Sequence, residues 1–177
     1  MATTTDVERV PTFTIDRVHK SWFWPSDDQS MIGPTVCVDI DGVLADATHR
    51  QHLLNSRWRD WDSFFEEAGG DGLLAQQAVL LEVFASDYVV ALVTARPAWI
   101  STITMTWLTE HDVRWDLLVM RDNSDLRRSA AMKTAAVEQL RERGLEPVLA
   151  LDDDPRNVVA YANSSIPCVY IHSGYHD

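Results

Sequence analysis

The stretch TVCVDIDG, residues 35–42, joins a short apolar run to two acidic residues placed one position apart. The apolar run has the pattern of a strand buried on both faces of a parallel sheet. It delivers Asp39 and Asp41 to the carboxyl end of that strand, where Gly42 lets the chain turn. Buried carboxylates are costly and repel each other, so a cation is expected to compensate them. Oxygen ligands favour Mg²⁺, and the apolar flank argues against a solvated acidic loop.

Size and charge restrict the kinds of protein that this sequence can encode. The 177 residues suffice for one domain with its own hydrophobic core. The 27 acidic and 15 basic residues give a formal net charge of −12 at pH 7. This charge argues against a protein that grips a long nucleic-acid duplex, because phosphate neutralisation supplies much of that affinity. A small phosphate or a strand end, bound locally, remains compatible with it.

The cysteines and the apolar segments indicate a reducing, membrane-free setting. Cys37 and Cys168 both lie in apolar, strand-like runs, so we expect reduced core residues and no disulfide. Polar residues interrupt the longest apolar region, residues 78–95, so no membrane span is expected. The first six residues lack the basic-then-apolar order of a signal peptide. We therefore expect a cytoplasmic protein.

Strands and helices alternate along most of the chain. We expect strands at residues 36–40, 88–94, 116–120, 147–151 and 167–171, and helices at 73–84, 97–110, 129–143 and 156–162. Asp71 is the expected N-cap of the first helix, Pro97 is expected to open the second, and Gly144 to close the third. Continuous apolar strands that alternate with helices predict an α/β fold, a Rossmann-like three-layer sandwich around a central parallel sheet.

We divide the chain into an N-terminal extension, residues 1–33, and one domain, residues 34–177. The sequence assigns the extension no role, although residues 12–15 have the pattern of a short strand and the aromatic run at 22–24 is expected to pack on the domain. Residues 46–71 interrupt the alternation, and we expect a small insert with one or two short helices there in place of a full lid domain.

The insert carries aromatic residues at roughly helical spacing, namely Trp58, Trp61 and Phe64. Two interpretations are open. We favour a hydrophobic seam beneath the insert. If the insert borders the site, one ring instead stacks on a nucleobase.

Polar residues stand where several predicted strands end, which is the edge at which parallel sheets usually bind ligands. After Asp39 and Asp41 come Thr94 at the end of the second strand and Lys133 near the start of a helix. The acidic run at residues 152–154 ends the fourth strand. Each signal alone is weak, because a solvated lysine or a strand-end threonine is common. The order of all four is specific.

Over residues 35–172 this order resembles the haloacid dehalogenase-like phosphohydrolase superfamily, which has DxDG, then a strand ending in Thr or Ser, then a lysine, then paired aspartates. The closest similarity is to the 3′-phosphatase domain of phage-type polynucleotide kinase/phosphatase. That domain has an arginine nine residues after DxD, matched by Arg50, and a hydroxyl-small-arginine triplet, matched by residues 94–96. Its Asp-x-Arg-basic element followed by lysine matches residues 125–133.

Two further details concern the match. A Ser-Gly element near the end of that domain is similar to residues 173–174. The family often has two aspartates after the basic pair, where this chain has Ser129 and Ala130. This departure bears on the polynucleotide substrate more than on the chemistry.

The resemblance implies phosphoryl transfer through an aspartyl-phosphate. Asp39 would be the nucleophile. Asp41 would protonate the leaving oxygen and then take a proton from water. This double role calls for a raised pKa, which we expect neighbouring carboxylates to supply. Thr94 and Lys133 would bind the phosphate. Mg²⁺ would be held by Asp39, the backbone carbonyl of Asp41 and Asp152, and Asp153 would complete the metal site through a metal-bound water or orient the lysine. Asp154 is expected to cap the following helix.

The leading hypothesis is an Mg²⁺-dependent phosphatase that removes 3′-phosphate from DNA or RNA ends, with Arg50, Arg96 and Arg127 gripping the substrate. A nucleotide or small-metabolite phosphatase is the alternative, favoured by the negative charge and by Ser129. A non-catalytic binding protein on the same fold is the third, although every catalytic position is filled. No GxxxxGK[ST] loop occurs, so a kinase or ligase that takes part would be a separate chain. The sequence does not predict an oligomeric state.

Overall fold

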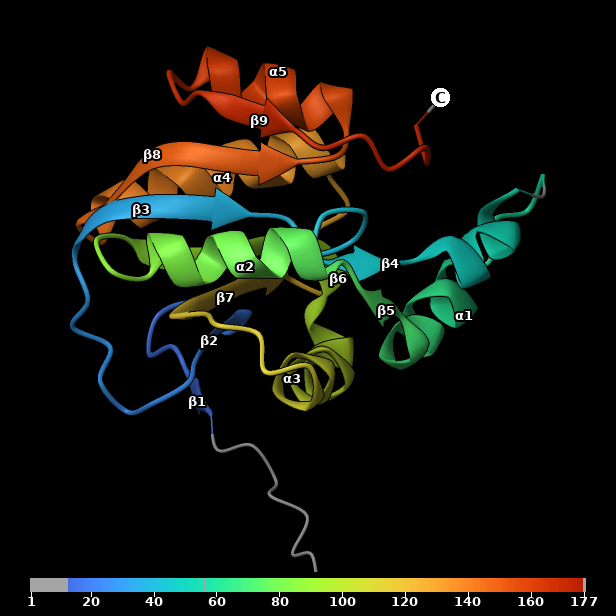
Figure 1. Cartoon of the computed structure of the whole chain (residues 1–177), viewed down its shortest axis with the longest axis horizontal. Helices are drawn as coiled ribbons and strands as arrows, with labels where there is room; N and C mark the ends of the chain where they lie inside the picture. The colour runs from blue at the N-terminus through green and yellow to red at the C-terminus, as the bar shows by residue number, and fades with distance from the viewer. Residues whose placement is uncertain (1–12, 56, 177) are drawn as a thin grey trace, which may run out of the picture.

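The computed structural model describes residues 13–55 and 57–176, and these fold around a seven-stranded sheet of order β1-β2-β7-β6-β3-β8-β9 (Figure 1). Five neighbouring strands are parallel, namely β7 (Leu117–Arg121), β6 (Val89–Pro97), β3 (Gly33–Val38), β8 (Leu145–Asp152) and β9 (Cys168–Tyr170). The two remaining strands, β1 (Thr14–Ile15) and β2 (Trp22–Trp24), are antiparallel. The predicted α/β, Rossmann-like fold is confirmed.

Helices cover both faces of the sheet, because successive residues of the buried strands point to opposite sides. Val36 and Val38 of β3 belong to one core cluster, together with residues of α2 (Ala75–Phe84) and α3 (Ser101–Glu110). Cys37 between them belongs to a second cluster, with residues of α4 (Ser129–Glu142) and α5 (Pro155–Asn163). The result is the expected three-layer sandwich.

Two expected helix starts are wrong. Leu74, not Asp71, precedes the first turn of α2, and no side chain caps that turn. Pro97 ends β6 in an extended conformation, a 3-10 turn η3 (Ala98–Ile100) follows, and α3 begins only at Ser101. Gly144 does follow α4 with a positive φ of 85°, a conformation that favours glycine after a helix.

The N-terminal segment is part of the sheet. Trp22 and Phe23 of β2 pair with Val119 and Leu118 of β7, and the three aromatic side chains at residues 22–24 are buried, as predicted. Of the predicted strand at residues 12–15, residue 12 lies outside the described residues and β1 covers Thr14–Ile15.

Buried polar contacts fix this hairpin to the domain. The side chain of Asp16 accepts a hydrogen bond from Trp24 Nε1 at 3.0 Å. Asp16 also pairs with Arg143 Nη2 at 2.9 Å, and the Arg143 guanidinium lies 5.1 Å from the centre of the Trp24 ring. Arg143 directly follows α4, so the hairpin is attached to the domain through its covering helices as well as through β7.

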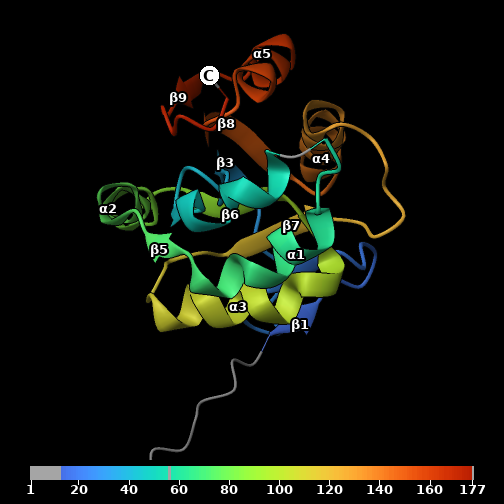
Figure 2. The ribbon, with the colours of Figure 1, turned by 90° about the vertical axis from the view of Figure 1, so that its right-hand side faces the viewer.

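The insert leaves and rejoins the domain through a two-stranded ribbon of β4 (Ala45–Asp46) and β5 (Gly72–Leu73). Between these strands lie three short helical segments, η1 (Thr48–Leu54), α1 (Trp61–Glu66) and η2 (Glu67–Gly70), where the sequence predicts one or two short helices. Figures 1 and 2 show the insert beyond the carboxyl end of β3, and its η2 segment contacts α3.

Two predictions made from composition can be checked against the described residues. Cys37 and Cys168 are both free; Cys37 is a buried core residue as expected, whereas Cys168 is only partly buried. None of the helices in the described ranges combines the length and the apolar character needed to cross a bilayer.

Candidate active site

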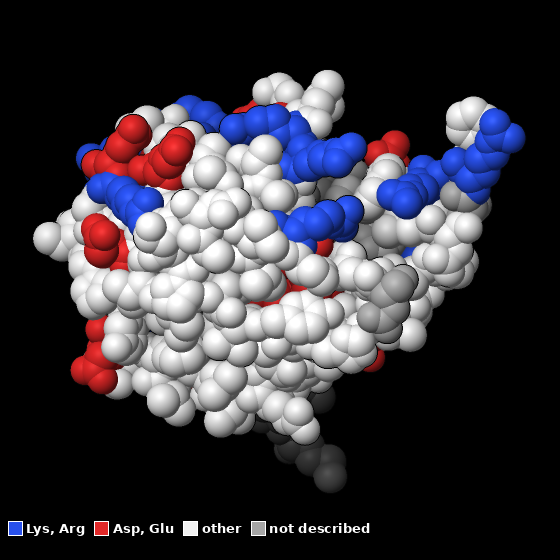
Figure 3. Space-filling view, turned by 90° about the horizontal axis from the view of Figure 1, so that it is seen from above, with Lys and Arg blue, Asp and Glu red and all other residues white. Residues whose placement is uncertain are grey.

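A cleft of about 630 Å³ opens at the carboxyl ends of the parallel strands. Asp39 directly follows β3, and Asp152 ends β8, with Asp153 and Asp154 after it. Asp39, Asp41 and Asp153 line the cleft, and residues from the insert and from the start of α5 form its walls. Figure 3 shows this hollowed face, on which Lys and Arg side chains gather. A parallel sheet is expected to bind its ligand at this edge.

Lys133 is buried among the acidic groups at the base of the cleft. Its Nζ atom lies 2.7 Å from Asp39 Oδ2 and 2.5 Å from Asp152 Oδ2, and the residue is only 1% exposed. Burial alone would lower the pKa of Lys133, but Asp152 and Asp39 outweigh burial and raise it. The lysine is therefore a permanent positive charge, delivered from the first turn and a half of α4.

The three carboxylates of Asp39, Asp152 and Asp153 each place an oxygen within 4.8 Å of the other two. Burial raises the pKa of Asp39 well above its usual value, and although Lys133 opposes this shift, Asp152 and Asp153 add to it. One lysine cannot balance three close carboxylates. Their oxygen atoms are the donor set that a hard divalent cation such as Mg²⁺ prefers, so these residues fit the expected metal.

Neighbouring groups hold the aspartates of β8 in place. Asp152 Oδ1 accepts hydrogen bonds from Asn157 Nδ2 and from the Asp154 amide. Asp153 Oδ2 accepts one from Ser173 Oγ at 2.6 Å. Gly42 fits against this pair, because a Cβ atom at that position would lie 2.1 Å from Asp153 Oδ2. Asp154 caps α5, as predicted.

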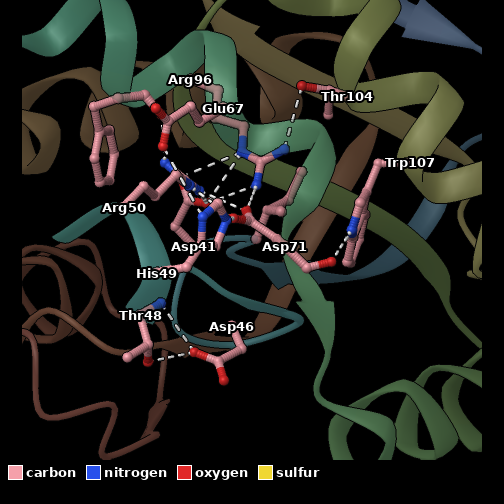
Figure 4. Close-up of polar contacts among 12 residues, drawn as sticks. Asp41, Asp46, Thr48, His49, Arg50, Glu67, Asp71, Arg96, Thr104 and Trp107 are labelled. Carbon is pink, nitrogen blue, oxygen red and sulfur yellow. Dashed lines mark hydrogen bonds and ion pairs between the residues drawn. The ribbon is translucent and has the colours of Figure 1, made fainter. Parts of the chain in front are cut away.

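The side chain of Asp41 points toward Arg50 and Arg96 (Figure 4), whereas that of Asp39 contacts Lys133. Arg50 Nη2 lies 2.5 Å and Arg96 Nη2 2.7 Å from Asp41 Oδ1. Burial opposes ionisation of Asp41, but Arg96 and Arg50 outweigh it and lower the pKa to about 2. The expectation that neighbouring carboxylates raise the pKa of Asp41 is therefore wrong, because two arginines surround this group instead.

Behind the two arginines lies Asp71, whose side chain is completely buried. Asp71 Oδ2 is 2.6 Å from Arg50 Nη2 and 2.7 Å from Arg96 Nη2. The backbone carbonyl of Asp71 accepts a hydrogen bond from Trp107 Nε1 of α3. Asp71 is thus a buried anion of the site and not the predicted helix cap. No motif in the sequence identifies it as a site residue.

The structure brings most of the predicted site residues together, but with different partners from those expected. Arg50 and Arg96 are fully buried and contact carboxylates, so neither lines the cleft. Thr94 is 1% exposed, and its Oγ1 accepts a hydrogen bond from the Arg96 amide. Arg127 pairs with Asp125 at 2.7 Å and lines a separate hollow, apart from Asp39.

Several residues that line the cleft carry no motif in the sequence. Arg59 comes from the insert, Arg156 from α5, and Tyr175 from the C-terminal segment. Tyr175 Oη donates a hydrogen bond to Asp46 Oδ1 at 2.9 Å and so ties this segment to the base of the insert. These positions become recognisable only when the fold brings the insert and the C-terminal segment to the same cleft.

Comparison with known proteins gives a consistent picture. A family model described as the polynucleotide kinase PNKP phosphatase domain matches residues 33–176. One chain in the structure of the Pnkp1/Rnl/Hen1 RNA repair complex is 25% identical in sequence to this protein, with a TM-score of 0.65. The alignment covers 84% of this protein and 45% of the chain in the complex. A second Pnkp1/Rnl/Hen1 complex gives 24% identity and a TM-score of 0.65, covering 82% and 48%.

A more distant match is a haloacid dehalogenase-like hydrolase from Streptococcus pneumoniae, with 13% identity, a TM-score of 0.52, and 78% and 84% of the two chains covered; it supports the fold alone. The chain spans less than half the length of the two repair-complex chains. No curated protein sequence matches it.

Proposed function

The chain belongs to the polynucleotide kinase PNKP phosphatase-domain family, and from this premise we propose that it removes the 3′-phosphate from polynucleotide ends. Membership makes the protein a phosphoric monoester hydrolase of the haloacid dehalogenase type. One observation carries the proposal: Asp39 and Asp41 line the same open cleft with different partners. Lys133 contacts Asp39, whereas two arginines contact Asp41. One carboxylate suits nucleophilic attack and the other suits proton transfer.

In the first step of this proposal a carboxylate oxygen of Asp39 attacks the phosphorus atom. The bond between phosphorus and the 3′ oxygen breaks, and its electron pair goes to that oxygen, which takes a proton from Asp41. The products are an aspartyl-phosphate and a 3′-hydroxyl. Because the pKa of Asp41 is about 2 in the free protein, a proton must accompany substrate binding. A phosphate dianion beside Asp41 raises its pKa by like-charge repulsion and so favours that proton.

In the second step a water molecule attacks the phosphorus of the aspartyl-phosphate. Asp41, now a carboxylate, takes a proton from the water, and the arginine contacts favour this ionised form. The bond from phosphorus to Asp39 breaks, its electron pair returns to the carboxylate, and inorganic phosphate leaves. The two steps together consume one water and restore both aspartates.

The buried cations support this chemistry without forming bonds to phosphorus. Lys133 holds Asp39 in place and adds positive charge beside the transferred group. We propose that Thr94 and the amide groups at the end of β6 bind phosphate oxygens, as the family resemblance implies. Held by Asp39, Asp152, Asp153 and the backbone carbonyl of Asp41, Mg²⁺ would neutralise the charge that develops on the phosphoryl oxygens.

The similar structures suggest the context of the reaction. Both repair-complex structures are assemblies of Pnkp1, Rnl and Hen1, and one chain of each aligns with this protein. We propose that this protein prepares nucleic-acid ends for a kinase or ligase that works with it. The free thiols of Cys37 and Cys168 fit the reducing conditions of a cytoplasmic location.

Phosphate release in the presence of Mg²⁺ from a matched set of substrates tests the proposal. The set contains a 3′-phosphorylated oligonucleotide, its 5′-phosphorylated twin, 3′- and 5′-mononucleotides and p-nitrophenyl phosphate. We expect the 3′-phosphorylated oligonucleotide to have the highest kcat/KM and Asp39→Asn, the control for contaminating phosphatase, to release none. DNA and RNA versions of that oligonucleotide identify which kind of end the enzyme prefers.

A nucleotide phosphatase is the second candidate, and two observations favour it. Ser129 lines the cleft at the position where the family often carries an aspartate, and the chain has a net charge of −12. Equal or faster turnover of the mononucleotides would establish this candidate in place of end repair, with the same chemistry at Asp39.

A further inference from the structure

The aromatic residues of the insert divide between the interior and the cleft. Phe64 is 5% exposed, and the Arg50 guanidinium lies 4.1 Å from the centre of its ring. Trp61, at the start of α1, is 45% exposed and lines the cleft with Phe65. Neither the seam nor the platform expected from the sequence describes all three predicted aromatics, because Phe64 packs inside and Trp61 faces the substrate side.

Trp61 is held as a rigid surface. Its ring stacks on Phe65, with centroids 5.8 Å apart and an interplanar angle of 26°, and meets Phe64 edge to face at 5.8 Å. Asp60 caps α1 by accepting a hydrogen bond from the Ser63 amide, which fixes the helix start where Trp61 lies. This exposed, supported indole ring lies in the same cleft as the proposed phosphate site and suits the stacking of a nucleobase. Any base can stack there, because every base has an aromatic face.

Two arginines line the same cleft from different elements. Arg59, two residues before Trp61, is exposed and forms no hydrogen bond or ion pair with any other residue in the described ranges. Arg156 of α5 is held against Asp154, with Nη2 2.7 Å from Oδ2, and its side chain is 72% exposed. In a chain of net charge −12, these cations favour an anionic ligand at this surface.

We propose that Arg59 and Trp61 form the subsite that recognises a single-stranded polynucleotide end. The base of the terminal nucleotide stacks on Trp61, and the phosphodiester on its 5′ side contacts Arg59, with Arg156 contributing from α5. This inference rests on the proposed function and extends it, because it makes a phosphodiester next to the terminal nucleotide a requirement for tight binding. A mononucleotide reaches Trp61 but lacks the group that Arg59 binds.

The test compares kcat and KM of variants on a 3′-phosphorylated oligonucleotide and on p-nitrophenyl phosphate. Trp61→Ala is expected to raise KM for the oligonucleotide about tenfold, the order of one lost base–aromatic stack. Trp61→Phe keeps a ring and is expected to retain most of the affinity. Both variants are expected to change KM for p-nitrophenyl phosphate by a smaller factor than KM for the oligonucleotide, because its single small ring covers less of the indole than a nucleobase does.

Arg59→Ala has a separate signature in its salt dependence. Removing one phosphate contact with a single strand is expected to flatten the plot of log(kcat/KM) against log[salt] by about 0.7. Tyr88→Ala and Arg17→Ala are the matched controls, since both residues are exposed and neither lines the cleft. Tyr88 stands just before β6, at the opposite end of that strand from the site. Both controls are expected to behave as wild type.

The outcomes separate the subsite from the reaction on which it rests. Hydrolysis of p-nitrophenyl phosphate without hydrolysis of the oligonucleotide by the wild-type protein overturns the proposed function, and the subsite with it. Hydrolysis of both substrates, with Trp61→Ala and Arg59→Ala matching their controls, overturns the subsite alone. Equal losses on both substrates overturn it as well, because they assign Trp61 to folding.

Discussion

Asp41 and Asp71 share the two guanidinium groups that lie between them, and each arginine contacts both carboxylates within 2.7 Å. Two buried positive charges are thereby matched by two negative ones, which offsets the cost of removing them from water. The position and the ionised state of Asp41 thus depend on a side chain thirty positions away in the sequence, at the far end of the insert. Asp71 is a positioning residue, because it acts on the site through Arg50 and Arg96.

The first prediction concerns this positioning. Asp71→Asn keeps the shape of the side chain but leaves the two arginines short of one negative charge. We expect the free energy of unfolding to fall by about 3 kcal/mol, the usual order when one partner of a buried ion pair is removed. Because Asp41 then loses its fixed geometry, kcat for the oligonucleotide is expected to drop about tenfold or more. Urea unfolding and steady-state kinetics measure the two effects.

Asp125→Asn is the matched control for this variant. It removes the partner of Arg127, whose side chain is 53% exposed. Although the Asp125 side chain is only 10% exposed, its partner reaches solvent, and such a surface pair contributes about 0–1 kcal/mol, so little change in stability is expected. Equal destabilisation by the two substitutions would contradict the importance assigned to Asp71.

The sequence predicts well those features that depend on short-range patterns, such as the buried strands and the residues at their ends. The apolar run before Asp39 and the run before Asp152 each specify a buried strand, and parallel pairing then brings their carboxyl ends together. The contacts among Asp39, Lys133 and Asp152 follow from that topology. They could therefore be expected from the order of the motifs along the chain.

What the sequence does not predict depends on which groups meet across the fold. Asp71 looks like a helix cap because an acidic residue precedes an apolar helical pattern. Only the return of the insert to β5 brings it beneath Arg50 and Arg96. The same contacts reverse the expected direction of the pKa shift of Asp41. Arg127 matches a motif by spacing, yet local pairing with Asp125 holds it away from the cleft.

The second prediction uses the leaving group to isolate the proton donated by Asp41. A sugar hydroxyl needs a proton in order to leave, whereas p-nitrophenolate does not. Asp41→Asn is expected to lower kcat on the 3′-phosphorylated oligonucleotide about 1,000-fold, within the range for loss of a general acid. With p-nitrophenyl phosphate the variant should still form the aspartyl-phosphate, and rapid mixing should show a burst of p-nitrophenolate equal to the enzyme concentration. Asp39→Asn should show no burst, because it cannot form the aspartyl-phosphate. If Asp41→Asn also showed no burst, it too would fail to form the aspartyl-phosphate, and the separate role proposed for Asp41 would be wrong.

The third prediction concerns the cation. Mg²⁺ is expected to raise the thermal unfolding midpoint of the wild-type protein relative to EDTA, since a ligand at about 100 times its Kd stabilises by about 2.7 kcal/mol. Asp153→Asn should remove most of this increase. Asp154→Asn, one residue along, should keep it, because Asp154 caps α5 and asparagine is an equally good cap. A Mg²⁺ response that both variants retain would exclude Asp153 from the binding site.

The fourth prediction concerns the N-terminal hairpin, which lies before the residues that the family model matches. Trp24 is fully buried, donates a hydrogen bond to Asp16 and packs against the guanidinium of Arg143. Trp24→Ala is expected to lower the free energy of unfolding by about 4 kcal/mol, the range for a large aromatic removed from a core. Ile15→Ala changes the neighbouring strand at a residue that is 48% exposed, and a loss of about 1 kcal/mol or less in the free energy of unfolding is expected there.

Urea unfolding of the two variants compares these values directly. Similar, small effects would mean that the hairpin is dispensable and that the domain is complete from β3 onward, whereas the expected difference would make residues 14–24 part of its core.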